Sequence, residues 1–475
     1  MVDVVDTTDR ALQATWKNVS MVAFDPGTGY NVSRTVFTFR RMGKAMLSDD
    51  LFSEICRIPA IDVHSHLRRN QMAATGVGKL LFYHMLVYPL RAAGGFDDAH
   101  WPSKQLHGDS PDTELLYDAW MRSWPLLSNT GFAWILQTIL RDLYEFDEPV
   151  TPESLPRLRA AFDRKANQPD WPRQVLTRGN IVAILSSYHD VPPLAPGEYD
   201  GGIRFTLETA PTVGTHEAFP WRQRLERLGR RAGIEIATLG QLARATQEFF
   251  DKTDWAGKNV LVNWIGSEAD FRPVDASVID RLLADCLRGM EPAPDGARLL
   301  EGAVVRCTLE AVRRRIKVYQ LVYGTQFPTA ENAPHPVQKA WHGFAASISH
   351  LAAEFPEIHF NILNGYEPDE PVLCSLCLAY ANVSLGSFWW QTFYPSVMHA
   401  AWHRRLDMVP VSRLCGFFSD GYSVDYIYGR LRLSQRVLAN VLAERIDRGF
   451  GTRQQALDIA RHVMLETPRK LLMGK

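Results

Sequence analysis

Several features that would tie the chain to a membrane or to an oxidising compartment are scarce or missing in the sequence. Cysteine accounts for six of the 475 residues, and the six are scattered, so they outline no disulfide framework. No run approaches the roughly 18 consecutive apolar residues that a membrane helix needs. The start of the chain, Met1 to Thr15, is polar and acidic, unlike a secretory leader. We therefore expect buried thiols and a cytoplasmic protein.

An excess of either charge is also missing. The sequence has 52 Lys and Arg against 53 Asp and Glu, a formal net charge of −1. This balance gives no electrostatic reason to expect a nucleic acid or a membrane surface as partner. The content of 46% hydrophobic and 22% charged residues is ordinary for a soluble globular protein. We expect a small-molecule partner, and homo-oligomerisation stays open.

What the sequence does contain is a pair of histidines, His64 and His66, at the end of an apolar run that begins at Ile58. Side chains two residues apart on a strand point the same way, so both imidazoles can reach one point beyond the strand end. Neutral imidazole is the commonest metal ligand in proteins, and a same-side pair supplies half of a four-ligand site. The alternative is a coincidence of two polar residues at a strand end.

Short apolar runs bounded by turn residues alternate with helical patterns along most of the chain. Strand–helix alternation predicts a parallel sheet, and eight repeats predict closure into a (β/α)8 barrel of the α/β class. The first run is the histidine strand at about 58–65. The other seven are Ile181–Ser186, Gly202–Thr206, Val260–Trp264, Lys317–Tyr323, Ile358–Leu363, Asn382–Leu385 and Leu414–Phe418.

The stretches outside this alternation define the expected domain organisation. Residues 1–56 look like an N-terminal arm that leads into a helix at about 48–56, and 57–475 form the barrel. Within the barrel, 68–178 has no clear strand and carries Trp, Leu and Tyr at helical spacing. This pattern predicts a helical insertion after the first strand.

Asp420 closes the last predicted strand. In a closed barrel the eighth strand lies beside the first, and the active site gathers at the C-terminal ends of the strands. We therefore expect Asp420 to join His64 and His66 on one divalent metal ion. This mixed nitrogen and oxygen ligand set suits zinc or manganese, and three protein ligands leave positions open for water or substrate.

A second pair of histidines, His399 and His403, shares one face of a predicted helix. No Glu follows the first of them, so the metalloprotease motif is absent. We expect this pair to lie outside the active site and to bind no second metal.

At this point the chain resembles a known family. The lead-in and the His64-Ser65-His66 pair resemble the first strand of the amidohydrolase superfamily, and more narrowly of its uronate isomerase branch. The segment Tyr83–Gly94, the long helical insertion, and the helix through Tyr428–Arg448 resemble that branch as well. The resemblance covers about residue 55 to the C-terminus.

The resemblance implies an aldose–ketose isomerase that acts on a uronic acid or a related sugar through an enediol. It implies that Asp420 is the base and that His84 binds the substrate or carries protons. Contacts to the sugar acid are expected from Arg91 and His189, and from Tyr422. Trp389 is expected either to stack on the sugar ring or to be an aromatic core residue.

The sequence departs from the family mainly in groups that would hold a uronate carboxylate. Gly421-Tyr422 stands where the isomerases carry Ser-Arg, and Met85 stands where they carry the tyrosine of a His-Tyr pair. Val322 replaces a histidine common in the superfamily, and the third-strand arginine has no counterpart. Arginine is the natural bidentate partner of a carboxylate. We therefore expect a less cationic site than that of the isomerases, with weak glucuronate binding.

The same ligand set leaves two further functions open. One is a metal-dependent hydrolase of the superfamily, in which Asp420 activates a metal-bound water against an ester, lactone or amide. The other is a binding protein that has lost catalysis, with the pocket filled by Met85, Val322 or Tyr422. An open polar cavity beside the three ligands would favour an enzyme.

Overall fold

In the computed structural model, residues 47–94, 114–187, 202–208, 220–255, 258–264, 269–326, 337–338 and 340–474 are described. Ser48–Lys475 form one compact unit. Of the expected N-terminal arm, 1–46 therefore lie outside the described residues. A helix spans 47–55, where the sequence predicts one at about 48–56.

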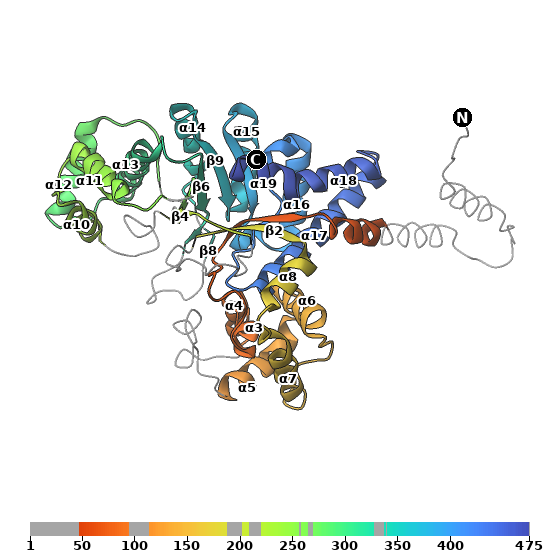
Figure 1. The fold of residues 1–475 in the computed structure, drawn as a ribbon. Coiled ribbons are helices and arrows are strands. Elements are labelled where there is room, and N and C mark those ends of the chain that lie inside the picture. The colour runs from red at the N-terminus through yellow and green to blue at the C-terminus, as the bar shows by residue number, and fades with distance from the viewer. Residues whose placement is uncertain are drawn as a thin grey trace, which may run out of the picture. The chain divides into compact units, whose positions relative to one another are not determined.

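Parallel strands form the wall of a barrel (Figure 1). They pair in the orders β1-β2-β3 and β4-β5-β6-β9-β10. Thr206 alone separates β3 from β4, so 203–208 acts as one barrel strand that pairs with both groups. The strands are β1 (Ala60–Ser65), β2 (Ile181–Ser186), β3 (Ile203–Phe205), β4 (Leu207–Glu208), β5 (Val260–Trp264), β6 (Val318–Tyr323), β9 (His359–Asn364) and β10 (Val383–Phe388).

The segment 414–421 closes the ring between β10 and β1. On one side, Leu414 forms a parallel bridge with Leu385 of β10. On the other side, the Val63 amide of β1 donates to the Phe417 carbonyl at 3.2 Å. With this eighth strand the barrel has the number of strands that the sequence predicts, and the (β/α)8 barrel is confirmed.

The eighth strand differs from the regular strand expected over Leu414–Phe418, because some of its backbone hydrogen bonds go to groups outside the neighbouring strands. The Gly416 amide donates to the Val463 carbonyl at 2.7 Å. The Ser419 amide donates to the Asp62 carboxylate at 2.9 Å. A side chain and the π-helix His462–Glu466 therefore occupy places that a neighbouring strand would take, and the eighth strand is extended but irregular.

Helices surround the barrel and form two lobes (Figure 1). The first lobe occupies the predicted insertion: α3 (Val77–Leu81), α4 (His84–Ala92), α5 (Glu114–Ser123), α6 (Gly131–Tyr144), α7 (Leu155–Ala166) and α8 (Trp171–Gly179). The second has an apolar core of its own and comprises α10 (Trp221–Ala232), α11 (Leu239–Asp251), α12 (Ala276–Leu287) and α13 (Pro294–Val312). The remaining helices are α14 (Phe344–Glu354), α15 (Glu370–Ala379), α16 (Pro395–Met408), α17 (Val424–Asp447), α18 (Arg453–Arg461) and α19 (Thr467–Met473).

Side chains fill the interior of the barrel. Val63 and Val322 belong to one buried cluster together with Trp389, and Leu465 and Leu472 from the C-terminal segment extend this cluster. Packing of this kind is expected, because the centre of an eight-stranded barrel is a core and not a pore. Function is therefore to be sought at the mouth of the barrel, where the strands end.

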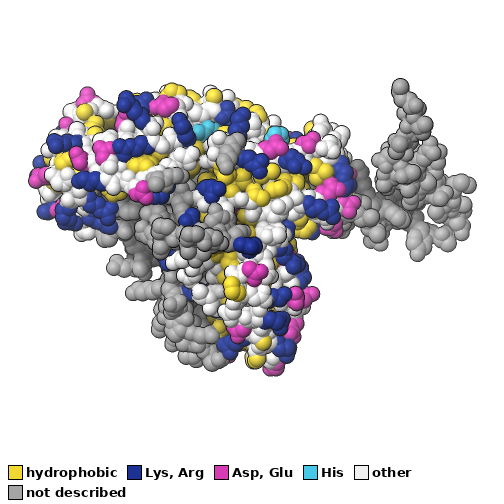
Figure 2. Space-filling view, in the orientation of Figure 1, with side chains coloured by type: hydrophobic (Ala, Val, Ile, Leu, Met, Phe, Trp, Pro, Cys, Tyr) yellow, Lys and Arg dark blue, Asp and Glu magenta, His cyan; other side chains and the backbone are white. Residues whose placement is uncertain are grey.

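The face of the molecule in Figure 2 carries basic and acidic side chains interspersed with apolar ones. Among the described helices, none has the length and apolar character needed to span a membrane. A short antiparallel pair, β7 (Thr325–Gln326) and β8 (Val337–Gln338), lies outside the barrel wall.

Candidate metal centre

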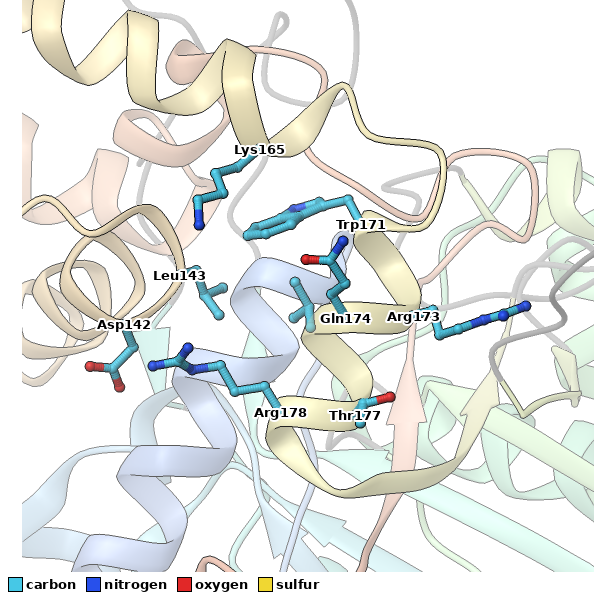
Figure 3. Close-up of a pocket in the computed structure, with 9 residues that line it drawn as sticks. Asp142, Leu143, Lys165, Trp171, Arg173, Gln174, Thr177 and Arg178 are labelled. Atoms are coloured by element: carbon cyan, nitrogen blue, oxygen red, sulfur yellow. The ribbon is translucent and has the colours of Figure 1, made fainter.

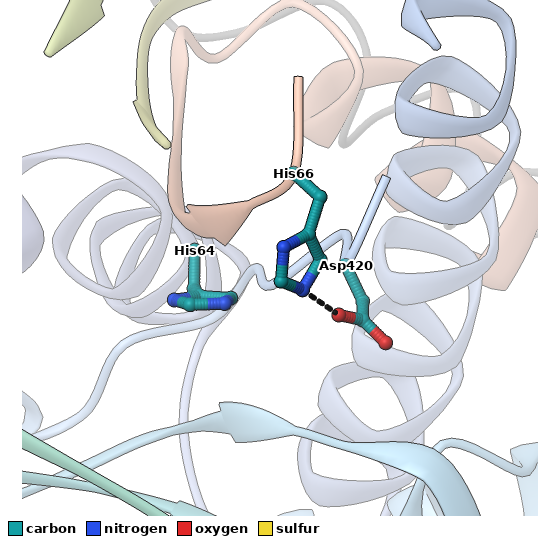
Figure 4. A group of neighbouring side chains, drawn as sticks. All are labelled: His64, His66 and Asp420. Carbon is teal, nitrogen blue, oxygen red and sulfur yellow. Dashed lines mark ion pairs between the residues drawn. The ribbon is translucent and has the colours of Figure 1, made fainter. Parts of the chain in front are cut away.

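The ends of β1 and of the eighth strand bring His64, His66 and Asp420 together (Figure 4). The ligand atoms that the three offer all lie within 4.8 Å of one another. The imidazole centroids are 5.1 Å apart with the rings at 84°. His66 Nε2 lies 3.1 Å from Asp420 Oδ1. His64 is fully buried, Asp420 is 3% exposed and the His66 side chain is 14% exposed, so little water reaches the three polar groups.

The backbone at Asp420 has the left-handed conformation, with φ of 52°. Aspartate tolerates this region better than most residues, although a non-glycine residue there still stores about 1–3 kcal/mol. Two hydrogen bonds hold the peptide in place. The Asp420 amide donates to the His64 carbonyl at 3.1 Å, and the Tyr83 hydroxyl donates to the Asp420 carbonyl at 3.0 Å. The turn therefore aims the carboxylate back at the histidines.

The ring of His66 is oriented by contacts on two sides. The hydroxyl of Ser187, just after β2, lies 2.9 Å from His66 Nδ1. The ring of Tyr422 stacks on the imidazole at 4.9 Å between centroids and 15° between planes. Because Nδ1 faces Ser187, Nε2 is the nitrogen that faces Asp420. A partner on the far nitrogen is what orients ligating histidines in metal sites.

This donor set fits a divalent metal ion. Two imidazoles and one carboxylate from rigid strand ends provide three protein ligands, and a catalytic metal site keeps further positions for water or substrate. Mixed nitrogen and oxygen donors suit zinc and manganese alike. The geometry therefore supports a metal at this place and leaves the choice of ion open.

Asp62 is a component of the site that the sequence analysis missed. It is fully buried in β1 and accepts hydrogen bonds from the amide and the hydroxyl of Ser419. Burial raises the pKa of its carboxyl to about 7, and the hydrogen bonds from Ser419 and from the His64 amide act against that shift. Asp62 thereby ties the histidine strand to the residue before Asp420. Its signal in the sequence is an acidic residue inside an apolar run.

Arg430 on α17 was missed as well. Its side chain is fully buried, and its Nη1 contacts the Met85 sulfur at 3.2 Å. Burial lowers the pKa of the guanidinium, while the neighbouring Asp420 and Tyr83 act in the opposite direction. Arg430 therefore brings a buried positive charge within electrostatic range of the acidic ligand.

Tyr83 changes one conclusion drawn from the sequence. Met85 suggests that the tyrosine of the family's His-Tyr pair is lost, yet Tyr83 precedes His84 and places its hydroxyl on the Asp420 carbonyl. Its ring stacks on Tyr426 of α17 at 3.5 Å between centroids. A tyrosine hydroxyl therefore borders the site from a neighbouring position in the chain.

The other predicted site residues have mixed fates. Tyr422 lies on His66, as described above. Arg91 lies in the last turn of α4 and is partly exposed. Trp389 is 1% exposed and packs in the barrel core, which is the second of the two expected roles. The side chain of His84 and the whole of His189 lie outside the described residues.

A cavity of about 450 Å³ opens elsewhere, in the helical insertion (Figure 3). Asp142 of α6, Lys165 of α7 and Trp171 of α8 line it, together with Arg173 and Arg178. None of the three candidate metal ligands borders this cavity. It is therefore separate from the site at the barrel mouth.

Comparison with known proteins gives a consistent result. No family model matches the chain. A uronate isomerase from Thermotoga neapolitana is 26% identical over 456 residues, which cover 89% of this chain and 96% of the relative. The crystal structure of a uronate isomerase from Thermotoga maritima superposes with a TM-score of 0.72 at 16% identity, over 90% of this chain and 97% of that one.

A more distant neighbour carries a different description. A structure from Lactobacillus casei, described as a metal-dependent hydrolase, superposes with a TM-score of 0.54 at 13% identity, over 89% of this chain and 97% of that one. The comparisons confirm the resemblance to uronate isomerases and the barrel fold that the sequence predicts.

Proposed function

We propose that the chain is a metal-dependent sugar isomerase, which interconverts the aldose and ketose forms of a uronic acid or a related sugar acid. The observation that carries this proposal is the convergence of His64, His66 and Asp420 at the mouth of the barrel. It is supported by similarity to uronate isomerases along nearly the whole chain.

A divalent ion, zinc or manganese, held by His64, His66 and Asp420 would polarise the sugar carbonyl or the neighbouring hydroxyl oxygen. Asp420 takes the proton from C2 of the aldose and returns one to C1, so that an enediol lies between the two sugars. The hydroxyl proton moves from O2 to O1, and His84 at the start of α4 is assigned to carry it.

Arg430 supports the role of Asp420 as a base. A base must be available as a carboxylate, and a buried guanidinium close by favours the charged form because the surroundings screen weakly. Arg430 is fully buried and interacts electrostatically with Asp420. It supplies positive charge behind the acid, whereas Arg91, His189 and Tyr422 are assigned to the substrate.

The second candidate is a hydrolase acting on an ester, lactone or amide. The hydrolase description of the Lactobacillus casei neighbour favours it. The same ligands would then serve to activate a water molecule. We place it second because the isomerase relatives are more similar to this chain both in sequence and in TM-score.

Proton NMR in heavy water separates the two functions. Metal-loaded protein is incubated with glucuronate or galacturonate, and isomerisation yields ketose signals and deuterium at the exchanging carbon. Asp420→Asn keeps the size of the side chain and removes the base, so the rate should fall by about 10²–10⁴-fold. The exposed His342 lies in the turn just before α14 and is not part of the ligand set; His342→Gln is the control. Untouched uronates together with cleavage of a lactone or ester would establish the hydrolase instead.

The metal is tested separately, by elemental mass spectrometry of the purified protein. His64→Ala/His66→Ala should carry one ion per chain fewer than the wild type, and equal metal content in both would refute the site. A cytoplasmic location is part of the proposal, and it is supported by the six cysteines, all of which are free thiols.

A further inference from the structure

A second cluster of metal-ligand side chains lies on the outer helices. His399 and His403 are one turn apart on α16, and Glu444 projects from α17. His399 Nε2 lies 3.0 Å from Glu444 Oε1, and His403 Nε2 lies 3.1 Å from Glu444 Oε2. The side chains are 35%, 20% and 32% exposed, respectively, so ions from solution can reach them.

The spacing of these atoms matches a coordination shell. In a tetrahedral site with bonds of about 2.0–2.1 Å, neighbouring ligand atoms lie about 3.3 Å apart. The two nitrogen–oxygen distances are close to this value, and the ligand atoms of the three residues all lie within 4.8 Å of one another. Both imidazoles already turn the same nitrogen toward one carboxylate, so little rearrangement is needed to admit an ion.

This cluster is distinct from the site at the barrel mouth. Asp420 lies just before the start of α17 at Val424, and Glu444 lies near the other end of that helix. Twenty residues of α-helix span about 30 Å at 1.5 Å per residue. A single ion cannot serve both places.

The charges near the cluster set the kind of ion. The Arg448 guanidinium lies 3.8 Å from Glu444 Oε2, whereas Arg445 pairs with Asp407 at 2.5 Å. One carboxylate beside a cation is a poor site for calcium or magnesium, which prefer several oxygen ligands. Two imidazoles favour zinc, nickel or copper.

We propose that His399, His403 and Glu444 form a second binding site for a divalent transition metal of the zinc class. The ion links α16 to α17 on the outside of the barrel. The proposal departs from the expectation from the sequence, which assigns no metal to the second histidine pair. The inference does not depend on the isomerase proposal, because it uses none of the residues at the barrel mouth.

Zinc titration of the metal-stripped full-length protein, followed by calorimetry, tests the site. The background is His64→Ala/His66→Ala, so that the remaining uptake comes from elsewhere. In this background we expect one zinc ion per chain. Loss of a residue that only hydrogen-bonds a metal ligand typically costs about 10–100-fold in affinity. His403→Gln removes a ligand itself, so it should weaken zinc binding by more than that. Equal binding with and without His403→Gln would overturn the proposal, as would no zinc uptake in the background protein.

A matched control is available in the same chain. His462 Nδ1 lies 3.0 Å from Glu466 Oε2, a contact of the same kind that belongs to no three-residue ligand group among the described residues. His462→Gln should therefore leave zinc affinity unchanged, and loss of binding in this variant would contradict the assignment. Thermal unfolding gives a readout independent of calorimetry: zinc should raise the melting temperature of the background protein and of His462→Gln, but not that of His403→Gln. The melting temperatures without zinc show whether each variant folds.

Discussion

Two arginines, Arg405 and Arg430, are both fully buried, yet their surroundings differ. Arg405 on α16 lies between its partners: Nε and Nη2 donate to the Glu370 carboxylate, and Nη1 donates to the Gly386 carbonyl at 2.8 Å. Burial acts to lower the pKa of the guanidinium, but the charge of Glu370 and its hydrogen bonds, with smaller contributions from Cys374 and Cys377, together outweigh burial and raise the pKa. Asn364 in turn donates to Glu370 at 3.1 Å.

Arg430 has a sparser set of partners. Nη1 contacts the Met85 sulfur, and the guanidinium lies 4.0 Å from the centroid of the Phe393 ring. Nε and Nη2 have no hydrogen-bond partner, and within the described parts of the chain no carboxylate lies within 4.0 Å of this guanidinium. Here burial is the dominant influence and lowers the pKa.

The difference distinguishes an ion pair that stabilises the fold from a charge that serves the candidate active site. Removing a guanidinium from water costs several kcal/mol, and excellent pairing is needed to offset it. Arg405 has such pairing and links α15 to α16 and β10. Arg430 lacks it and lies beside Asp420, where the proposed chemistry takes place. Polar groups that are costly to bury and incompletely paired are concentrated at functional sites.

The largest effect is expected from breaking the complete pair. Arg405→Met leaves the Glu370 carboxylate buried without its cation, which should lower the free energy of unfolding by about 3–5 kcal/mol. Urea denaturation measures the loss. Arg405→Met/Glu370→Met removes both charges and should recover much of it; a double variant less stable than the single one would contradict this account of the pair.

A second expected effect concerns acid stability. Burial lowers the pKa of His359 on β9 to about 4, and its Nε2 lies 2.7 Å from the Ser384 hydroxyl. The folded state therefore prefers the neutral ring. Its contribution is complete above pH 6.5 and is lost as the pH falls from about 6.5 through 4, because the unfolded chain takes up the proton first. The shift corresponds to about 3 kcal/mol.

Unfolding free energies measured from pH 7 to pH 4 test this window. His359→Gln should flatten the decline, whereas His350→Gln, at an exposed position of α14, should keep it. A decline of the same steepness in His359→Gln would show that another group controls acid stability.

The smallest expected change in stability, but one that sharpens the comparison, comes from Arg430→Met. An apolar side chain of similar length avoids the desolvation cost, so stability should change by less than about 1 kcal/mol or increase. The rate of uronate isomerisation should fall by about 10²-fold, the order seen when one electrostatic group is removed from an active site. A large loss of stability with an unchanged rate would place Arg430 in the same class as Arg405.

Local patterns explain how much of this could be predicted. The strands Ile181–Ser186 and Val260–Trp264 coincide with β2 and β5, because short apolar runs between turn residues are typical of strands buried on both faces. The approach of His64, His66 and Asp420 follows from strand alternation and barrel closure alone. Each of these rules depends on neighbouring residues and a known topology.

What the sequence did not reveal depends on tertiary packing. Tyr83 contacts Asp420 from the turn before α4, and Arg430 acts on it electrostatically from α17. An arginine in a helix ordinarily indicates a solvated surface. Nearly every residue in the first half of α17 is buried, so the usual polar face is absent there. The irregularity of the eighth strand was missed for a similar reason, since its hydrogen bond to the Asp62 carboxylate joins residues 357 apart in the chain.

That sequence separation has a consequence for how the protein is made. A ribosome adds about 5–20 residues per second, so roughly 20–70 s pass between the synthesis of Asp62 and that of Ser419. During this interval β1 lacks one of its two neighbours, and the histidines that follow Asp62 lack their carboxylate. The three-ligand centre therefore comes into existence only after translation of almost the entire barrel, and metal loading by this set of ligands is a late event in the life of the nascent chain.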